Sequence, residues 1–248
     1  YTSNGQWHLA PHLALLNRLV LDLATRKKKR LIIEVPVRHG KSYLLSYYTP
    51  AWWVGKFPDE NVMLASYGAD LAFRWSAKAK QLIENYGREI FGVECEGSAG
   101  YWKIIGREGG VRAAGVGGPI SGFGADILII DDALKNQEEA KSELIRESVW
   151  DWLISTAYGR LEPNGVAVII GSRWHEDDPT GRIKSKMLRN EIEKWEVFNL
   201  PAIAEENEPL WPDGLGRRVG EALWPERYDL NTLSETQKVV GAYWWNAQ

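Results

Sequence analysis

Four runs of apolar residues, each bounded by turn-forming residues, constrain the fold of this chain more than any other feature. The runs are LIIEV (31–35), NVMLASY (61–67), ILIIDD (127–132) and VAVIIGSRW (166–174). A strand that is apolar on both faces has to be covered on both faces, as happens in parallel sheets with helical crossovers. The sequence therefore predicts an α/β fold with a central, mainly parallel sheet flanked by helices.

The segments between these runs carry apolar residues at helical spacing. We predict helices over residues 7–25, 41–53, 69–87, 135–161, from Asp178-Pro179 onward, and 230–245. Pro50 is expected to kink or end the second helix, and Gly87 to cap the third. Glu162–Gly165 is expected to form a turn, and YWKII and GVRAAGV to form short strands or hairpin arms.

The length and composition fit one large domain with a small appendage. The chain has 248 residues, of which 44% are hydrophobic, so it can bury a substantial core. We expect residues 1–200 to form this core, including a lead-in helix. Residues 201–248, rich in Pro, Gly and Trp, are expected to pack on it as irregular chain and a helix. The single cysteine, Cys95, excludes an internal disulfide and suggests a reducing compartment.

The overall charge argues against a general nucleic-acid binder, which is usually basic. The net charge is −3 and the pI is about 5.9. The one concentrated basic run, RKKKR (26–30), fits the solvated end of a helix, with a nucleic-acid patch or a targeting signal as alternatives. The sequence shows no apolar run of about 18 residues and no signal-peptide pattern, so we expect an intracellular protein without membrane contact.

A Gly-Lys-Ser triplet follows the first apolar run, where a phosphate-binding loop would lie. Gly40 would allow close backbone approach, Lys41 would supply charge, and the Ser42 hydroxyl could bind Mg²⁺. The usual pattern has a first glycine at position 35, where this chain has Val35, and Arg38 adds a cation to the loop. A lone Gly-Lys-Ser also occurs by chance, so the context decides.

Two later runs supply that context. Asp131 and Asp132 end a buried strand, as a Mg²⁺-binding acid and a water-activating acid would in an ATPase. The alternative, a helix cap at the strand end, accounts for one aspartate but hardly for both. Ser172 and Arg173 end the next strand, where they could sense a terminal phosphate. Arg173 could equally pair with a surface acid.

Taken together, PVRHGKS, ILIIDDALKNQEEA and GSRWHEDDPTGRI resemble the ATPase domain of the large terminase subunit of tailed bacteriophages, the motor that packages viral DNA. The closing segment LWPERYDLNTLSETQKVVGAYWWNAQ is similar to the stretch that precedes the nuclease domain in that family. The family carries an arginine ahead of GK[ST], as Arg38 does here, and so Val35 fits a variant loop. The resemblance implies a P-loop NTPase fold of the ASCE/RecA-like class.

The resemblance also implies roles for individual residues. Lys41 would bind the β- and γ-phosphates, Ser42 and Asp131 would hold Mg²⁺, and Asp132 would be the catalytic carboxylate, with Arg38 also in the catalytic group. The ATP-binding set would be Pro36, Val37, Arg38, His39, Gly40, Lys41, Ser42 and Gln6. Ser172 and Arg173 would form the coupling segment. Related terminases often carry an arginine that acts on a neighbouring subunit in the loop where this chain has Phe123, and the nearest upstream candidates here are Arg112 and Arg107, neither of them well aligned with the family position.

The implied function is ATP hydrolysis that drives double-stranded viral DNA into a procapsid, with ATP and Mg²⁺ as cofactors. The implied partners are viral DNA, the portal protein, the small terminase subunit and further copies in a ring, in the host cytoplasm. A nuclease would need acids downstream of Gln248, so we expect no DNA cleavage by this chain. The alternatives are a helicase-like DNA-dependent ATPase, a non-hydrolysing nucleotide-binding ring scaffold, or a plain α/β protein with an accidental triplet.

Overall fold

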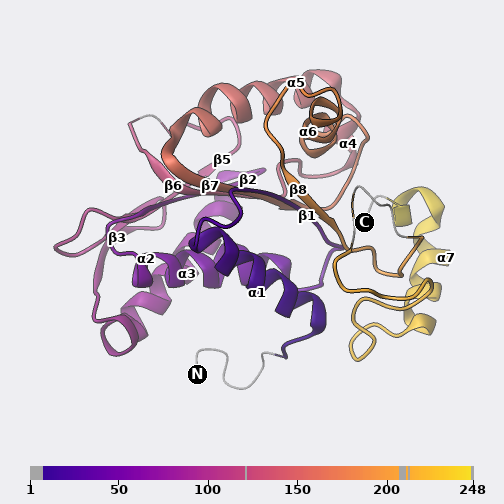
Figure 1. The fold of residues 1–248 in the computed structure, drawn as a ribbon, viewed down its shortest axis with the longest axis horizontal. Helices are drawn as coiled ribbons and strands as arrows, with labels where there is room; N and C mark the ends of the chain where they lie inside the picture. The colour runs from indigo at the N-terminus through magenta and orange to yellow at the C-terminus, as the bar shows by residue number, and fades with distance from the viewer. Residues whose placement is uncertain (1–7, 121, 207–210, 212, 247–248) are drawn as a thin grey trace.

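An eight-stranded sheet forms the middle layer of the molecule (Figure 1). The computed structural model describes residues 8–120, 122–206, 211 and 213–246. The strand order across the sheet is β3-β4-β5-β2-β6-β7-β1-β8. The strands are β1 (Arg30–Glu34), β2 (Asn61–Ser66), β3 (Cys95–Ser98), β4 (Tyr101–Ile104), β5 (Gly110–Gly115), β6 (Ala125–Asp131), β7 (Leu161–Gly171) and β8 (Glu196–Asn199).

The predicted mainly parallel sheet is confirmed. Each neighbouring pair from β5 to β8 is parallel, whereas β3–β4 and β4–β5 are antiparallel and form one edge. All four apolar runs of the sequence lie in the parallel part, as β1, β2, β6 and β7. Their carboxyl ends therefore meet at one edge of the sheet.

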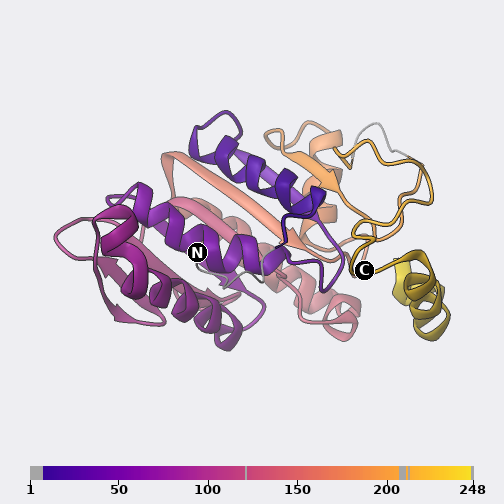
Figure 2. The same cartoon turned by 90° about the horizontal axis from the view of Figure 1, so that it is seen from below.

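Helices cover both faces of the sheet (Figures 1 and 2). Helices α1, α2 and α3 lie on one face, α4, α5 and α6 lie on the other, and α7 stands apart beside β1 and β8. The α-helices are α1 (Pro11–Ala24), α2 (Thr49–Lys56), α3 (Ala69–Phe91), α4 (Gln137–Lys141), α5 (Glu143–Asp151), α6 (Pro179–Leu188) and α7 (Leu230–Asn246). Among the described residues, no helix is long and apolar enough to cross a membrane.

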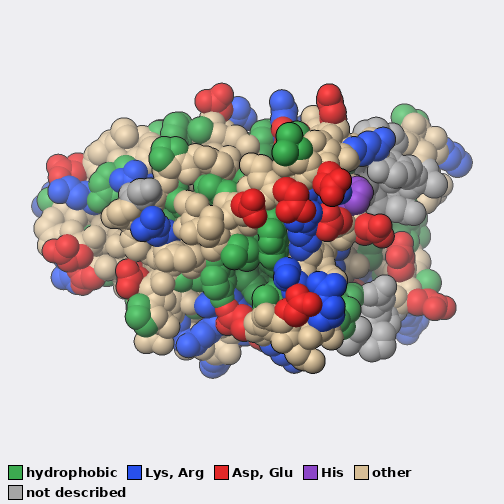
Figure 3. All heavy atoms as spheres, turned by 90° about the horizontal axis from the view of Figure 1, so that it is seen from above, with side chains coloured by type: hydrophobic (Ala, Val, Ile, Leu, Met, Phe, Trp, Pro, Cys, Tyr) green, Lys and Arg blue, Asp and Glu red, His purple; other side chains and the backbone are tan. Residues whose placement is uncertain are grey.

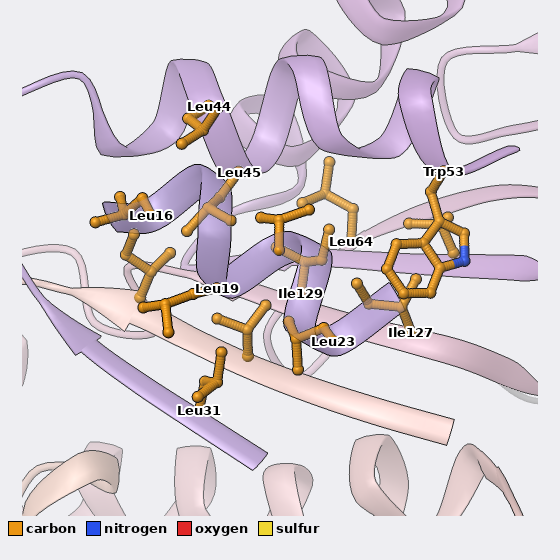
Figure 4. Close-up of a cluster of buried hydrophobic side chains, with 14 of the residues drawn as sticks. Leu16, Leu19, Leu23, Leu31, Leu44, Leu45, Trp53, Leu64, Ile127 and Ile129 are labelled. Atoms are coloured by element: carbon orange, nitrogen blue, oxygen red, sulfur yellow. The ribbon is translucent and has the colours of Figure 1, made fainter. Parts of the chain in front are cut away.

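The larger core cluster lies between the sheet and helices α1 to α3 (Figure 4). Leu16, Leu19 and Leu23 of α1 follow helical spacing and are at most 2% exposed, so they form one continuous stripe. Burying each such side chain contributes about 1.5–3 kcal/mol. This stripe packs over β1 and fixes α1 beside the segment that follows β1.

The helix that follows the Gly-Lys-Ser triplet continues to Lys56, three residues beyond the predicted end, and Pro50 does not end it. Residues Tyr43–Tyr48 form a π-helical segment that continues directly into α2. Leu44 O accepts hydrogen bonds from the backbone N–H of Thr49 and, at 2.8 Å, from its hydroxyl. The wider turn ahead of Pro50 accommodates a residue that has no N–H and whose ring would clash in a regular helix.

The predicted cap of the third helix was placed too early. Helix α3 continues past Gly87 and ends at Gly92, which has the left-handed φ of +72°. Gly87 is buried, and a Cβ there would lie 2.8 Å from the Ile83 side chain and from Val93 O. Gly87 is therefore used for close packing, and Gly92 for the helix end.

Two further boundaries differ from the sequence-based expectation. The predicted helix over 135–161 is interrupted at Ser142, whose hydroxyl accepts a hydrogen bond from Ile145 N and caps α5. The predicted turn Glu162–Gly165 belongs to β7 and forms an irregularity in its pairing with β6. The strand then ends at Gly171, so that residues 172–174 extend beyond the sheet.

The chain after β8 is largely irregular and returns to the core. Its Leu223 is 2% exposed and joins the main core cluster, and Trp224 packs with Ala10 and Leu13. An isolated antiparallel bridge pairs Ile203 with Ala222 within this segment.

Candidate functional site

Three neighbouring strands deliver the predicted site residues to one edge of the sheet. Asp131 of β6 pairs with Ile170 of β7, and Glu34 of β1 pairs with Gly171 of β7. The residues that follow these pairs therefore stand side by side at the carboxyl ends of the strands. This is the position where parallel α/β sheets bind ligands.

The loop between β1 and the next helix has the conformation that a close backbone turn requires. Arg38 has φ of +65° and Gly40 has φ of +82°. A Cβ at Gly40 would approach a methyl group of Leu13 to 3.2 Å, so that a glycine suits this position for both backbone and space. Positive φ at a non-glycine residue such as Arg38 is uncommon and is found preferentially at functional sites.

The ammonium group of Lys41 is buried and fully engaged. Lys41 is 5% exposed, and its Nζ lies 3.1 Å from Asp132 Oδ1, 3.0 Å from Ser172 Oγ and 3.4 Å from Val35 O. These contacts join the loop after β1 to the ends of both β6 and β7. The structure thus brings Lys41 together with two residues that are 91 and 131 positions away in the sequence.

The carboxylate of Asp131 is completely buried and accepts two hydroxyl hydrogen bonds. Ser42 Oγ donates to Asp131 Oδ1 at 3.0 Å, and Ser46 Oγ donates to Oδ2 at 2.7 Å. Burial, followed by the adjacent Asp132 charge, raises the pKa of Asp131 to about 6, while Lys41 and the two serines oppose the rise. A cation at this position would favour the ionised form.

Asp132 turns its side chain back toward Lys41. It has φ of +52°, a left-handed conformation that aspartate tolerates better than most residues. Its Oδ1 accepts from Lys41 Nζ and, at 3.1 Å, from the backbone N–H of Ser172. The side chain remains 26% exposed, so solvent reaches this carboxylate but not that of Asp131.

The residues at this edge fit a Mg²⁺ ion that also contacts phosphate oxygens. Mg²⁺ prefers oxygen ligands and is commonly held by one or two carboxylates together with substrate phosphates. The Ser42 hydroxyl and the Asp131 carboxylate are such ligands and lie next to each other. No group of three or more His, Cys, Asp or Glu side chains that could hold a metal occurs in the described part of the chain.

Arg173 does not join its neighbour Ser172 at Lys41. Its guanidinium group lies 3.1 Å from Glu34 Oε1 and 2.8 Å from Asp178 Oδ2. Lys184 Nζ lies 2.6 Å from Glu34 Oε2, and Asp178 caps α6. The carboxylates of Asp178 and Glu34 raise the pKa of Arg173 against the opposing effect of burial, which is the largest single influence. Arg173 therefore ties the end of β7 to β1 and α6.

The opposite side of the loop packs against α1 and against the segment that precedes α7. His12 Nε2 of α1 lies 2.8 Å from His39 O, and the rings of His39 and Tyr228 are 5.0 Å apart. Burial lowers the pKa of His39 to about 4, and it also lowers the pKa of His12. His39 is therefore a neutral, packed residue of the loop.

A cleft of about 990 Å³ opens beside the loop. Its walls come from residues 34–39, from residues 172–176 and from the chain that follows β8. Ser172 and His39 line it, so the cleft adjoins both the Lys41 cluster and the loop.

The other predicted residues take varied positions. Pro36 is buried, whereas Val37 and Arg38 are exposed, and Arg38 makes no hydrogen bond or ion pair within the part of the chain that the structure describes. Gln6 lies outside the described residues. Arg112 lies on β5, four strands from β1, with its guanidinium carbon 4.7 Å from the centre of the Tyr101 ring.

The basic run 26–30 is largely neutralised by ion pairs. Arg26 pairs with Glu60, Lys28 with Glu196 and Arg30 with Glu193. These pairs support the solvated-surface interpretation over a nucleic-acid patch. On the face covered by α4 to α6, acidic and basic side chains are likewise interspersed (Figure 3).

Several residues of the site were not predicted from the sequence, among them Ser46 and Glu34. Ser46 lies four positions after Ser42, on the same helical face, and that spacing was the available signal. Glu34 is a charged residue at the end of an otherwise apolar strand. It is only 5% exposed, and its carboxylate is paired with Lys184 inside the protein.

The family described as "Terminase large subunit, T4likevirus-type, N-terminal" matches residues 32–236. Among solved structures, the large terminase of bacteriophage HK97 is 15% identical with a TM-score of 0.56, covering 91% of this chain and 47% of that chain. The large terminase of a thermophilic bacteriophage is 12% identical with a TM-score of 0.45, covering 69% and 43%. The chain thus spans less than half of the length of these structures. No curated protein matches the sequence.

Proposed function

Because the chain belongs to the T4likevirus-type terminase large-subunit family, we propose that it binds and hydrolyses ATP with Mg²⁺ and uses this reaction to move viral double-stranded DNA. The observation that carries the proposal is the convergence of Lys41, Ser42, Asp131, Asp132 and Ser172 at one edge of the sheet. If the Gly-Lys-Ser triplet were accidental, its side chains would not be expected to contact a pair of aspartates from a strand that is distant in the sequence.

The contacts of each residue support its proposed role. Lys41 would neutralise the β- and γ-phosphates, and the backbone N–H groups at the start of its helix would face the same anion. Ser42 and Asp131 would hold Mg²⁺, which when bound offsets negative charge on the phosphates. Asp132, the solvent-accessible acid, would orient and deprotonate the attacking water.

The resting contacts also imply a rearrangement. Lys41 Nζ is bound to Asp132 and Ser172, so a triphosphate would compete with both for the ammonium group. Once Lys41 turns to the phosphate, Asp132 and Ser172 become available to the reacting groups. Ser172 is thereby a candidate for the coupling residue, and Arg173 would transmit its movement to α6 and β1.

Phosphate release by the purified chain tests the proposal. Lys41→Ala is expected to reduce turnover at least a hundredfold and to weaken ATP binding, because it removes the charge that faces the phosphates. Asp132→Asn is expected to reduce turnover to a similar extent with ATP binding within about threefold of wild type, because it removes the base without altering size. Lys56→Ala and Asp151→Ala, on exposed positions of α2 and α5, are the matched controls.

Unchanged turnover in both site variants would exclude this site as the centre of hydrolysis. ATP binding by the wild-type chain without any phosphate release, even at high protein concentration, would instead select a non-hydrolysing nucleotide-binding scaffold.

The remaining family-level features are also proposals for this chain. We propose that residues 1–200 form the motor core and that residues 201–248 pack on it. The portal protein, the small terminase subunit and further copies in a ring are the proposed partners, in the host cytoplasm. Arg112 stays the candidate for an arginine that acts on a neighbouring subunit.

A further inference from the structure

The side chains that line the cleft beside the phosphate loop differ in chemical character from those around Lys41. Its walls beyond the loop are mainly aliphatic and aromatic, and the aromatic members are Trp174, Trp211, Tyr228 and Trp245. Three of the charged groups that also line it, Glu34, Arg173 and Lys184, are engaged with one another, and Arg38, Glu176 and Glu205 complete the charged part of the lining. The aromatic part of the walls suits a flat, aromatic ligand.

The cleft adjoins the loop on the side where a nucleotide could extend. On the α1 side of the loop, Leu13 fills the space at Gly40. On the side that faces the sheet, the side chains of Lys41, Asp131 and Asp132 fill the space. On the third side, Val37, Arg38 and His39 open directly into the cleft.

Tyr228 is an aromatic wall that contacts the loop itself. Its ring centre lies 5.0 Å from that of His39, the residue before Gly40, at an interplanar angle of 37°. Asn199 and Thr236 line the same cleft and offer an amide and a hydroxyl group, which can read the polar edge of a base. Figure 1 shows the chain after β8 and helix α7 beside the ends of β1 and β8. The cleft lining joins these side chains to residues of the loop.

We propose that this cleft receives the adenine base of the ATP molecule whose phosphates bind at Lys41, and that Tyr228 is its stacking wall and a specificity-determining residue. The inference rests on the proposed ATP binding. It assigns the base-binding site to the C-terminal segment of the chain, through a side chain that also contacts the phosphate loop.

Calorimetric titration with Mg²⁺–ATP and with Mg²⁺–tripolyphosphate tests this assignment, because tripolyphosphate has no base. Tyr228→Ala is expected to weaken ATP binding about tenfold and tripolyphosphate binding less than twofold, since stacking is lost and the phosphate contacts remain. Tyr228→Phe keeps the ring and is expected to keep ATP affinity. Tyr86→Ala on α3, outside the cleft lining, is the matched control.

Two results would overturn the assignment: unchanged ATP affinity in Tyr228→Ala, or an equal loss for both ligands, which would make Tyr228 a support of the loop. If Tyr228→Ala does not fold, as judged by circular dichroism, Trp245→Ala on α7 replaces it with the same expected selectivity. Absence of ATP binding by the wild-type chain would overturn the assignment too. Failure of the proposed hydrolysis would give a different result, because the wild-type chain would then bind ATP without releasing phosphate.

Discussion

At the scale of single residues, the site depends on groups whose charge is set by burial. Burial raises the pKa of Asp131 and lowers the pKa of His39 and of His12. Both histidine rings pack where the loop after β1 lies between α1 and Tyr228, and burial there favours their neutral forms.

Burial of the two histidines contributes stability that is lost in acid, whereas the raised pKa of Asp131 acts in the opposite direction. The pKa of His39 is about 4 in the folded chain and about 6.5 when unfolded. The unfolded chain therefore binds more protons between these values, so the stability present above pH 6.5 is lost as the pH falls toward 4. Between about pH 7.5 and pH 5.5, His39 alone should cost about 1 kcal/mol of unfolding free energy. His12 should add to this loss.

Urea denaturation at the two pH values measures the effect. The His39→Gln variant has no ionisable ring, and it should lose about 1 kcal/mol less than wild type over the same interval. Its absolute stability is not the readout, because the glutamine packs differently. Equal losses in wild type and variant would show that His39 does not carry the effect.

At the scale of secondary-structure elements, the sequence predicted existence and order well and boundaries less well. Four of the six strands in the parallel part of the sheet follow from unbroken apolar runs, because only two-sided burial makes such runs favourable. Pro50 does not end the helix, because the π-helical segment ahead of it accommodates a residue that lacks an N–H. The sequence could not show which of Gly87 and Gly92 caps the helix, because the close packing of Gly87 against Val93 is a tertiary contact.

The end of α3 provides a test of this distinction. Gly92→Ala should destabilise the chain by about 1 kcal/mol, because φ of +72° is unfavourable for a residue with a Cβ, although the added atom would meet nothing within 4 Å. Gly159→Ala is the matched control, since Gly159 also has open space but no positive φ. Thermal unfolding should separate the two variants, and equal midpoints would refute the left-handed cap as the cause.

At the scale of the whole molecule, a buried ionic cluster connects parts that the sequence keeps far apart. Glu34 at the end of β1 binds Arg173 after β7 and Lys184 of α6. From the sequence, Arg173 was expected near the terminal phosphate or on a surface acid, since no local pattern reveals a partner 139 residues away. Long-range pairing of this kind becomes visible only when the strand order is known.

Removal of the shared carboxylate should therefore affect the entire fold. Glu34→Ala leaves Arg173 and Lys184 without their buried partner, and we expect a loss of roughly 3 kcal/mol in unfolding free energy. Glu193→Ala removes the exposed partner of Arg30 and should cost less than about 1 kcal/mol. Chemical denaturation of both variants gives the comparison. Similar small losses would mean that solvent screens the Glu34 cluster.

The contacts of His39 with His12 and Tyr228 have a practical consequence for anyone who shortens this polypeptide. Deleting the first helix would uncover one side of the loop that follows β1, and cutting before position 224 would uncover the other. Either truncation would loosen the cluster around Lys41, although both deleted segments lie outside the strands that carry it. A shortened chain that keeps this cluster intact should therefore retain both segments.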